Sequence, residues 1–100
     1  MRIEKNNNEN VLTVKVIGKL DTNTAPELEA SVNEDIKDIK ELVFDFSDLN
    51  YISSAGLRVV LIFHKLMASR TGKLIIYKPN DDVMEIFDMT GFSTFLNIKE

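Results

Sequence analysis

The feature that most limits the possible folds of this chain is a regular alternation of strand-like and helix-like segments. Three runs rich in β-branched and apolar residues are separated by two segments with helical character; the runs are 11–17, 42–46 and 74–77. In the first helical segment Leu28, Val32 and Ile36 recur every four residues and share one face. Such alternation is typical of α/β domains, in which right-handed crossovers join parallel strands. Val43 and Phe44 are adjacent apolar residues, which favours a central strand with helices over both faces.

The N-terminal segment predicts an antiparallel hairpin. Residues 2–5 resemble a short strand, and an asparagine-rich run at 6–10 separates them from the strand at 11–17. Asparagine tolerates left-handed backbone conformations and hydrogen-bonds its own backbone. We therefore expect the run 6–10 to form the hairpin turn, and residues 18–21 to leave the second strand.

The first two helices have sequence signals at their ends. Thr24 and Glu27 have the spacing of a capping box, which predicts that the first helix begins there. The second helix is expected from about residue 53 to 68, with Gly72 as its stop signal. Residues 47–52, before it, are interpreted as a connection.

The C-terminal part predicts a third helix and a last strand. Asn80 or Asp81 is placed to cap the helix, which ends before Gly91, and residues 95–98 form the strand. The sequence thus predicts one α/β domain over residues 1–100. Its small mixed sheet has four or five strands, mostly parallel with an N-terminal antiparallel hairpin, and packs with about three helices.

Composition excludes several classes of function. The 100 residues contain no cysteine and one histidine, so neither a thiolate nucleophile nor a multi-histidine metal site is expected within one chain. A formal net charge of −4 argues against binding to nucleic acid, which favours a basic surface. The longest apolar run has five residues at 59–63, far short of the ~20 that cross a membrane. The N-terminus has no signal-peptide pattern, so we expect a cytoplasmic protein. The residue types suggest no metal site, and we expect no cofactor.

The most informative segment runs from Asp45 to Leu61, where a strand ends and a helix begins. Ligands of open α/β sheets usually bind at this end of the strands. Ser53 and Ser54 are placed to cap the helix. Gly56 follows, and glycine inside a helix costs about 1 kcal/mol relative to alanine. Two explanations stay open for it: close packing against a neighbouring element, or approach of a partner surface to the backbone.

A hydroxyl at a helix N-terminus is suited to carrying a phosphate. The first turn has unpaired N–H groups and a partial positive charge, both of which stabilise a phosphate. Phosphorylation would add about −1.5 to −2 charges without unfolding the helix. Asp21, Asp45 and Asp48 would deepen the repulsion of a docked partner if the strand ends cluster, although turn aspartates more often bond their own backbone.

The segment 51–61, Tyr-Ile-Ser-Ser-Ala-Gly-Leu-Arg-Val-Val-Leu, resembles the signature of STAS domains, specifically of bacterial anti-sigma factor antagonists. The resemblance extends to Gly-Lys-Leu-Asp at 18–21, to the strand at 42–46 and to Gly91-Phe92. It implies a non-enzymatic protein that binds an anti-sigma factor, itself a GHKL-type serine kinase, and so frees a sigma factor. The kinase phosphorylates the antagonist, and a PP2C-type phosphatase resets it.

The same resemblance assigns the site residues. The phosphoacceptor of the family falls on Ser54, with Ser53 as the alternative because it replaces the aspartate of the family pattern. Around it, the residues expected to contact the partner are Asp21, Tyr51, Ile52, Ser53, Ser54, Ala55, Gly56, Leu57 and Arg58.

Two alternatives remain beside this interpretation. In a non-switching scaffold, such as a stressosome-like or transporter-associated STAS subunit, Ser54 would only cap the helix. An enzyme with Ser54 as nucleophile lacks a base, because His64 lies ten residues farther along the helix, roughly 15 Å away. Arg58, at i+4 from Ser54, either steadies a phosphate or is an ordinary exposed residue. Nucleotide binding beside Asp21 is possible by analogy with some STAS domains, but fold alone does not establish it.

Overall fold

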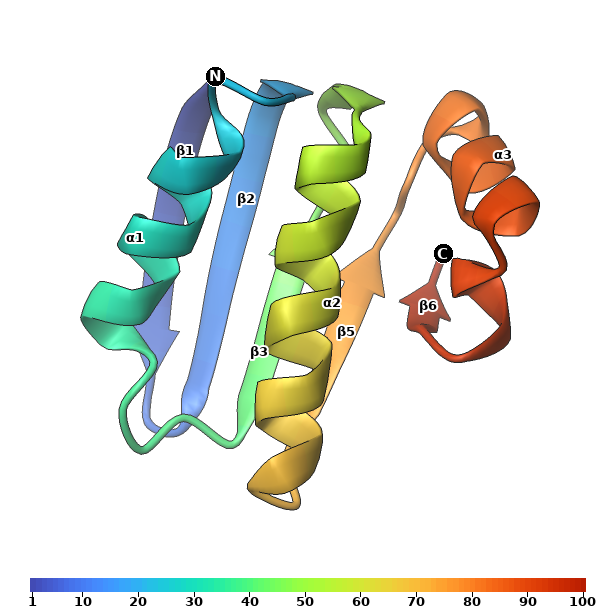
Figure 1. Ribbon diagram of the computed structural model, residues 1–100. Helices are drawn as coiled ribbons and strands as arrows, with labels where there is room; N and C mark the ends of the chain where they lie inside the picture. The colour runs from blue at the N-terminus through green and yellow to red at the C-terminus, as the bar shows by residue number, and fades with distance from the viewer.

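The computed structural model describes residues 1–100 as one mixed sheet with helices packed on it (Figure 1). The elements in chain order are β1 (Arg2–Asn8), β2 (Val11–Leu20), α1 (Ala25–Asp35), β3 (Glu41–Asp45), β4 (Leu49–Ile52), α2 (Ser54–Ser69), β5 (Lys73–Tyr77), α3 (Asp81–Thr90), a short 3-10 helix at Phe92–Thr94, and β6 (Asn97–Lys99).

The sheet has the order β1-β2-β3-β5-β6, with β4 paired to the far end of β2. β1 is antiparallel to β2, whereas β2, β3, β5 and β6 run parallel to one another. The predicted α/β class, the mostly parallel sheet, the N-terminal antiparallel hairpin and the three helices are therefore confirmed.

The core lies between the sheet and the helices. Figure 1 shows α1 and α2 side by side on one face of the sheet. α3 packs against β4 and buries Phe87 in the same core. Phe44 and Phe46 are fully buried there, and the Phe44 ring meets Phe63 of α2 edge-on at 6.2 Å. Val43, the neighbour of Phe44, is only half-buried. The expectation of helices over both faces of this strand is wrong, because α1 and α2 occupy the same face.

The hairpin turn is shorter than predicted and occupies only the end of the asparagine-rich run. Residues 6–8 belong to β1, pairing Asn6 with Thr13 and Asn8 with Val11, and the turn is the dipeptide Glu9-Asn10. Glu9 adopts the left-handed conformation with φ 57°. The β-branched start of β2 extends the antiparallel ladder, and this pairing outweighs the turn preference of asparagine.

The segment before α2 also departs from the prediction. β2 does not end at residue 17 but continues to Leu20 through an irregularity between Gly18 and Lys19. Gly18 has φ 103°, which glycine adopts without strain. The region interpreted as a connection contains β4, which pairs in parallel with the bent end of β2 and buries Leu49 and Ile52.

Helix ends agree with the sequence signals in part. Asn80 caps α3 by accepting the Val83 N–H at 2.8 Å, and Gly91 ends it with φ 82°. The capping box at Thr24 is absent, since its side chain makes no capping bond to α1. α2 ends at Ser69, and Gly72 is needed for a different reason: a Cβ there would overlap the Lys40 carbonyl oxygen.

Candidate functional site

Ser53 connects β4 to α2 and fixes the position of the signature segment. Its backbone is extended, its N–H donates to the Leu20 carbonyl at 2.9 Å, and its carbonyl accepts the Leu57 N–H at 2.9 Å. Its hydroxyl oxygen accepts the Gly56 N–H at 3.4 Å and is half-buried. Ser53 is therefore the N-cap that ties the start of α2 to β2.

Ser54 is the first residue of α2 and has a different environment. Its side chain is exposed and forms no hydrogen bond with another protein group. The N–H groups of a first helical turn have no acceptor within their helix. The Ser54 hydroxyl thus projects into solvent where the partial positive charge of α2 is greatest.

Gly56 is buried against the end of β2 and against β4. A Cβ at this position would lie 2.8 Å from Ile52 Cγ1, 2.9 Å from Leu20 Cγ and 3.0 Å from the Leu20 carbonyl oxygen. Of the two explanations for this glycine, the structure favours close packing, because its backbone faces the interior and not a partner.

Asp21 organises the turn between β2 and α1. Its Oδ1 accepts the N–H groups of Asn23 at 2.9 Å and Thr24 at 3.1 Å, and the Thr24 hydroxyl accepts the Asp21 N–H at 2.8 Å. The backbone hydrogen bond from Thr24, followed by that from Asn23, holds the pKa of Asp21 below its usual value although desolvation opposes the shift. Asp21 is therefore a stable anion that caps its own turn.

The other two aspartates at this end of the sheet are also held locally. Asp45 accepts the Ser47 N–H at 3.0 Å and the Ser47 hydroxyl at 2.7 Å. Asp48 forms an ion pair with Lys15 at 3.1 Å, which raises the pKa of Lys15. Asp45 therefore bonds the backbone of its own turn, as the turn interpretation expects, whereas Asp48 is held by an ion pair with Lys15 instead.

A groove of about 250 Å³ lies between the first turns of α1 and α2. Its walls are small and apolar residues with one acid and one base: Thr22, Ala25, Pro26, Glu29, Ala55, Arg58 and Val59. The residues on the α1 side of this groove were not among the predicted contact residues. A signal was present, since Pro26 and Glu29 lie three residues apart and so share one face of the helix that follows the Asp21 turn.

The residues expected to contact a partner divide by exposure. Tyr51 is 46% exposed, Ser54 and Arg58 are exposed, and Asp21, Ser53 and Ala55 are half-buried. The three buried ones are Ile52, Gly56 and Leu57. A partner can reach the first six of these residues, while the buried three support them from below.

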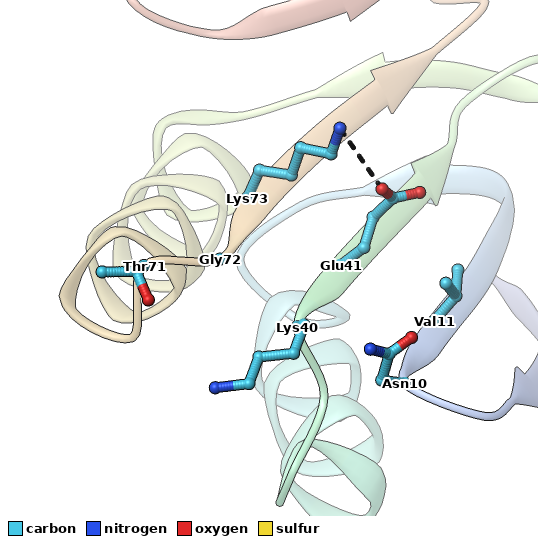
Figure 2. Close-up of a pocket in the computed structure, with 7 residues that line it drawn as sticks. All are labelled: Asn10, Val11, Lys40, Glu41, Thr71, Gly72 and Lys73. Carbon is cyan, nitrogen blue, oxygen red and sulfur yellow. Dashed lines mark ion pairs between the residues drawn. The ribbon is translucent and has the colours of Figure 1, made fainter.

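A second hollow of about 250 Å³ lies at the opposite ends of the parallel strands (Figure 2). The residues around it come from the starts of β2, β3 and β5: Asn10, Val11, Lys40, Glu41, Thr71, Gly72 and Lys73. Lys73 pairs with Glu41 at 3.4 Å, and the N–H groups of Lys40 and Glu41 both donate to the Asn10 carbonyl. These polar groups serve the local structure, so we do not assign the function to this hollow.

His64 lies in the second half of α2, half-buried, with its ring 4.9 Å from that of Phe95. It belongs to a small aromatic cluster with Phe92 and is not part of the surface around Ser54. No set of three or more His, Asp or Glu side chains is gathered as a metal ion would need. None of the helices has the length and apolar composition of a membrane span.

Comparison with known proteins places this geometry in a family. The chain is 32% identical over 93 residues to BtrV, a candidate anti-sigma factor antagonist of Bordetella bronchiseptica, covering 92% of this chain and 80% of BtrV. It is 28% identical over 91 residues to the anti-sigma-B factor antagonist of Listeria monocytogenes, covering 88% of this chain and 78% of that protein.

Solved structures agree on the fold. The anti-sigma factor antagonist SpoIIAA in its unphosphorylated form superposes with a TM-score of 0.85 at 17% identity, over 97% of this chain and 87% of that one. The model of the STAS domain matches residues 2–100. The chain therefore belongs to the STAS domain family.

Proposed function

We propose that this protein is an anti-sigma factor antagonist that works by partner switching. It binds an anti-sigma factor with GHKL-type serine kinase activity, which frees a sigma factor, and phosphorylation of Ser54 releases it again. A PP2C-type phosphatase restores the binding form. The proposal rests on the family, on the names of its relatives and on the surface around Ser54.

The observation that carries the proposal is the contrast between the two adjacent serines. Ser53 is half-buried and its hydroxyl caps α2, whereas Ser54 is exposed and its hydroxyl forms no hydrogen bond with another protein group. A kinase needs an acceptor hydroxyl that can enter its active site, and Ser54 meets this need without any opening of the fold. In the transfer, Ser54 Oγ bonds to the γ-phosphorus of ATP as the bond to the bridging oxygen breaks, and the hydroxyl proton passes to a base of the kinase.

Phosphorylation at this position acts through charge. The phosphate brings about −1.5 to −2 charges to a surface that already carries Asp21. A partner docked over Tyr51, Ser54 and Arg58 would have to desolvate or oppose that charge. Close like charges across an interface cost several kcal/mol, enough to release the partner. The proposal assigns no catalytic group to this chain.

The test is co-incubation of the protein with the GHKL-type anti-sigma kinases of its organism and ATP, followed by intact mass and peptide mapping. We expect one added phosphate on the peptide with Ser53 and Ser54, present in Ser53→Ala and lost in Ser54→Ala. Loss only in Ser53→Ala would move the acceptor to Ser53 and keep the mechanism.

Binding without phosphorylation is the outcome that separates the alternatives. If one kinase binds the protein tightly but transfers no phosphate, the non-switching scaffold, stressosome-like or transporter-associated, replaces the proposal. If no anti-sigma factor binds at all, both the antagonist role and its switch are refuted.

A further inference from the structure

Arg58 is a cation without a partner beside the proposed phosphorylation site. It is exposed and takes part in none of the five ion pairs of the structure, which engage Arg2, Lys5, Lys15 and Lys73 as cations. It also makes no side-chain hydrogen bond, unlike Arg70, which donates to the Ile36 carbonyl at 2.6 Å. Nothing in the fold therefore restrains its guanidinium group.

Helix geometry places Arg58 over Ser54. Residues at i and i+4 are separated by only about 40° around the helix axis, and their Cβ atoms lie ~5–6 Å apart. Long helical side chains also point back toward the N-terminus of their helix. The Arg58 side chain therefore extends toward the first turn of α2, where Ser54 is.

Ser53 does not have this relation to Arg58. A residue at i+5 lies about 140° away around the axis, on another side of the helix. Ser53 is moreover the N-cap, with an extended backbone and a hydroxyl directed at the Gly56 N–H. The position of Arg58 therefore distinguishes between the two candidate acceptors.

Arg58 is also the cation of the groove between α1 and α2. Glu29 of α1 lines the same groove, but the two side chains form no ion pair with each other. The remaining lining residues carry no charge. The groove thus holds one positive and one negative group, and neither is held by an ion pair with the other, so each can interact with another charged group.

We propose that Arg58 binds the phosphate of phosphorylated Ser54 and is thereby withdrawn from the groove, a regulation that rests on the proposed function of Ser54. A guanidinium group suits this task because two of its N–H groups can donate to two phosphate oxygens at once. Capture leaves Glu29 as the sole charge of the groove. One modification then changes two adjacent surfaces: it adds an anion at the start of α2 and removes the cation from the groove.

The second pKa of the phosphate measures this contact directly, because a bound guanidinium group stabilises the dianion. We would install phosphoserine at position 54 during translation and titrate the phosphate by ³¹P NMR at 0.1 M salt. Relative to the unsubstituted protein, Arg58→Gln should raise the second pKa by roughly 0.3–0.7 unit, the range expected for an exposed ion pair. Arg58→Lys should give an intermediate value, because it keeps the charge and loses the paired donors.

Two controls separate a contact from a general charge effect. Lys65→Gln removes the same charge from an exposed position eleven residues along α2, and its shift should stay below about 0.1 unit because screening acts over ~10 Å at 0.1 M salt. Phosphoserine at position 53 should titrate identically with and without Arg58→Gln. The unfolding temperature should not change in Arg58→Gln, since this side chain has no protein partner.

Equal pKa values in the unsubstituted protein, Arg58→Gln and Lys65→Gln would overturn the proposal. This outcome would leave the proposed function intact, because a phosphate can release a partner without Arg58. Conversely, the absence of phosphorylation by any kinase would refute the proposed function but not the binding of the phosphate by Arg58, since the titration uses phosphoserine installed without a kinase.

Discussion

Replacement of Gly56 by alanine tests whether packing under the start of α2 holds the site in place. The new methyl group would lie 2.8 Å from Ile52 Cγ1, 2.9 Å from Leu20 Cγ and 3.0 Å from the Leu20 carbonyl oxygen. These atoms belong to the interior of two fully or nearly fully buried side chains and to the backbone of β2. None of them is the mobile end of a long side chain, so α2 must shift away from the sheet.

Two opposing contributions decide the magnitude. An added methyl group in a packed interior costs about 1–3 kcal/mol. Alanine gains up to ~1 kcal/mol over glycine within a helix, and less in the first turn. We expect Gly56→Ala to lower the free energy of unfolding by about 1–2 kcal/mol, or the melting temperature of a domain this size by roughly 5–10 °C.

The assay is urea unfolding of Gly56→Ala with two companions. Ala30→Gly, at an exposed position of α1, measures the helix contribution on its own and should cost about 1 kcal/mol. In a double-mutant cycle, Leu20→Ala removes the contact with Cγ, one of the three close contacts, so Gly56→Ala should cost less in that background by about 0.5–1 kcal/mol. A Gly56→Ala protein as stable as the unsubstituted one, with no coupling to Leu20, would refute the packing argument.

Three further predictions concern the turns around the sheet. Asp21→Ala removes a carboxylate whose folded pKa lies below its ordinary 3.8, mainly through the Thr24 backbone N–H. The stabilisation from this carboxylate is present above about pH 4 and is lost as the pH falls through the folded pKa, so the difference between the two proteins in urea unfolding should be full at pH 7 and shrink steadily as the solution is acidified below pH 4. Asn80→Ala removes the cap of α3 and the bond to the Leu49 carbonyl at 2.9 Å, and should cost about 1–2 kcal/mol in thermal unfolding, with a loss below ~0.5 kcal/mol counting against the cap. Gly91→Ala has open space for its Cβ but φ 82°, so it should cost about 1 kcal/mol from backbone strain alone, and Gly91→Asn should recover part of that loss.

The fold could be predicted where a long periodic pattern marks a strand or a helix. It could not be predicted where the conformation of a segment depends on the strand that it pairs with. The runs of β2, β3 and β5 and the apolar face of α1 are local signals, so these elements could be located from the sequence. β4 has only four residues, and its pairing depends on the bend that Gly18 allows in β2. No local pattern contains that information, because it resides in the contact between two segments about thirty residues apart. The asparagine-rich run at 6–10 was mispredicted for the same reason, because pairing with β2 makes residues 6–8 a strand.

The site was predictable through the family signature, and its chemistry only in part. The sequence places Ser53 and Ser54 at the start of the second helix. Their different environments depend on how the start of α2 packs against the end of β2, which the sequence does not reveal. The capping box at Thr24 failed because the Asp21 carboxylate takes over the backbone N–H groups of that turn. The groove was missed because it requires α1 and α2 to lie next to each other, which periodicity within either helix does not reveal.

The rigidity of the start of α2 explains why a switch at Ser54 would act by charge and not by shape. The Ser53 N–H donates to the Leu20 carbonyl, and Gly56 packs against the Leu20 side chain. A phosphate on the exposed Ser54 hydroxyl breaks neither contact, so we expect the backbone at the start of α2 to keep its position. The partner then meets an unchanged surface with a new electrostatic field. In that situation the response can be enlarged only by nearby side chains that are free to move, and Arg58 is the charged residue beside Ser54 with that freedom.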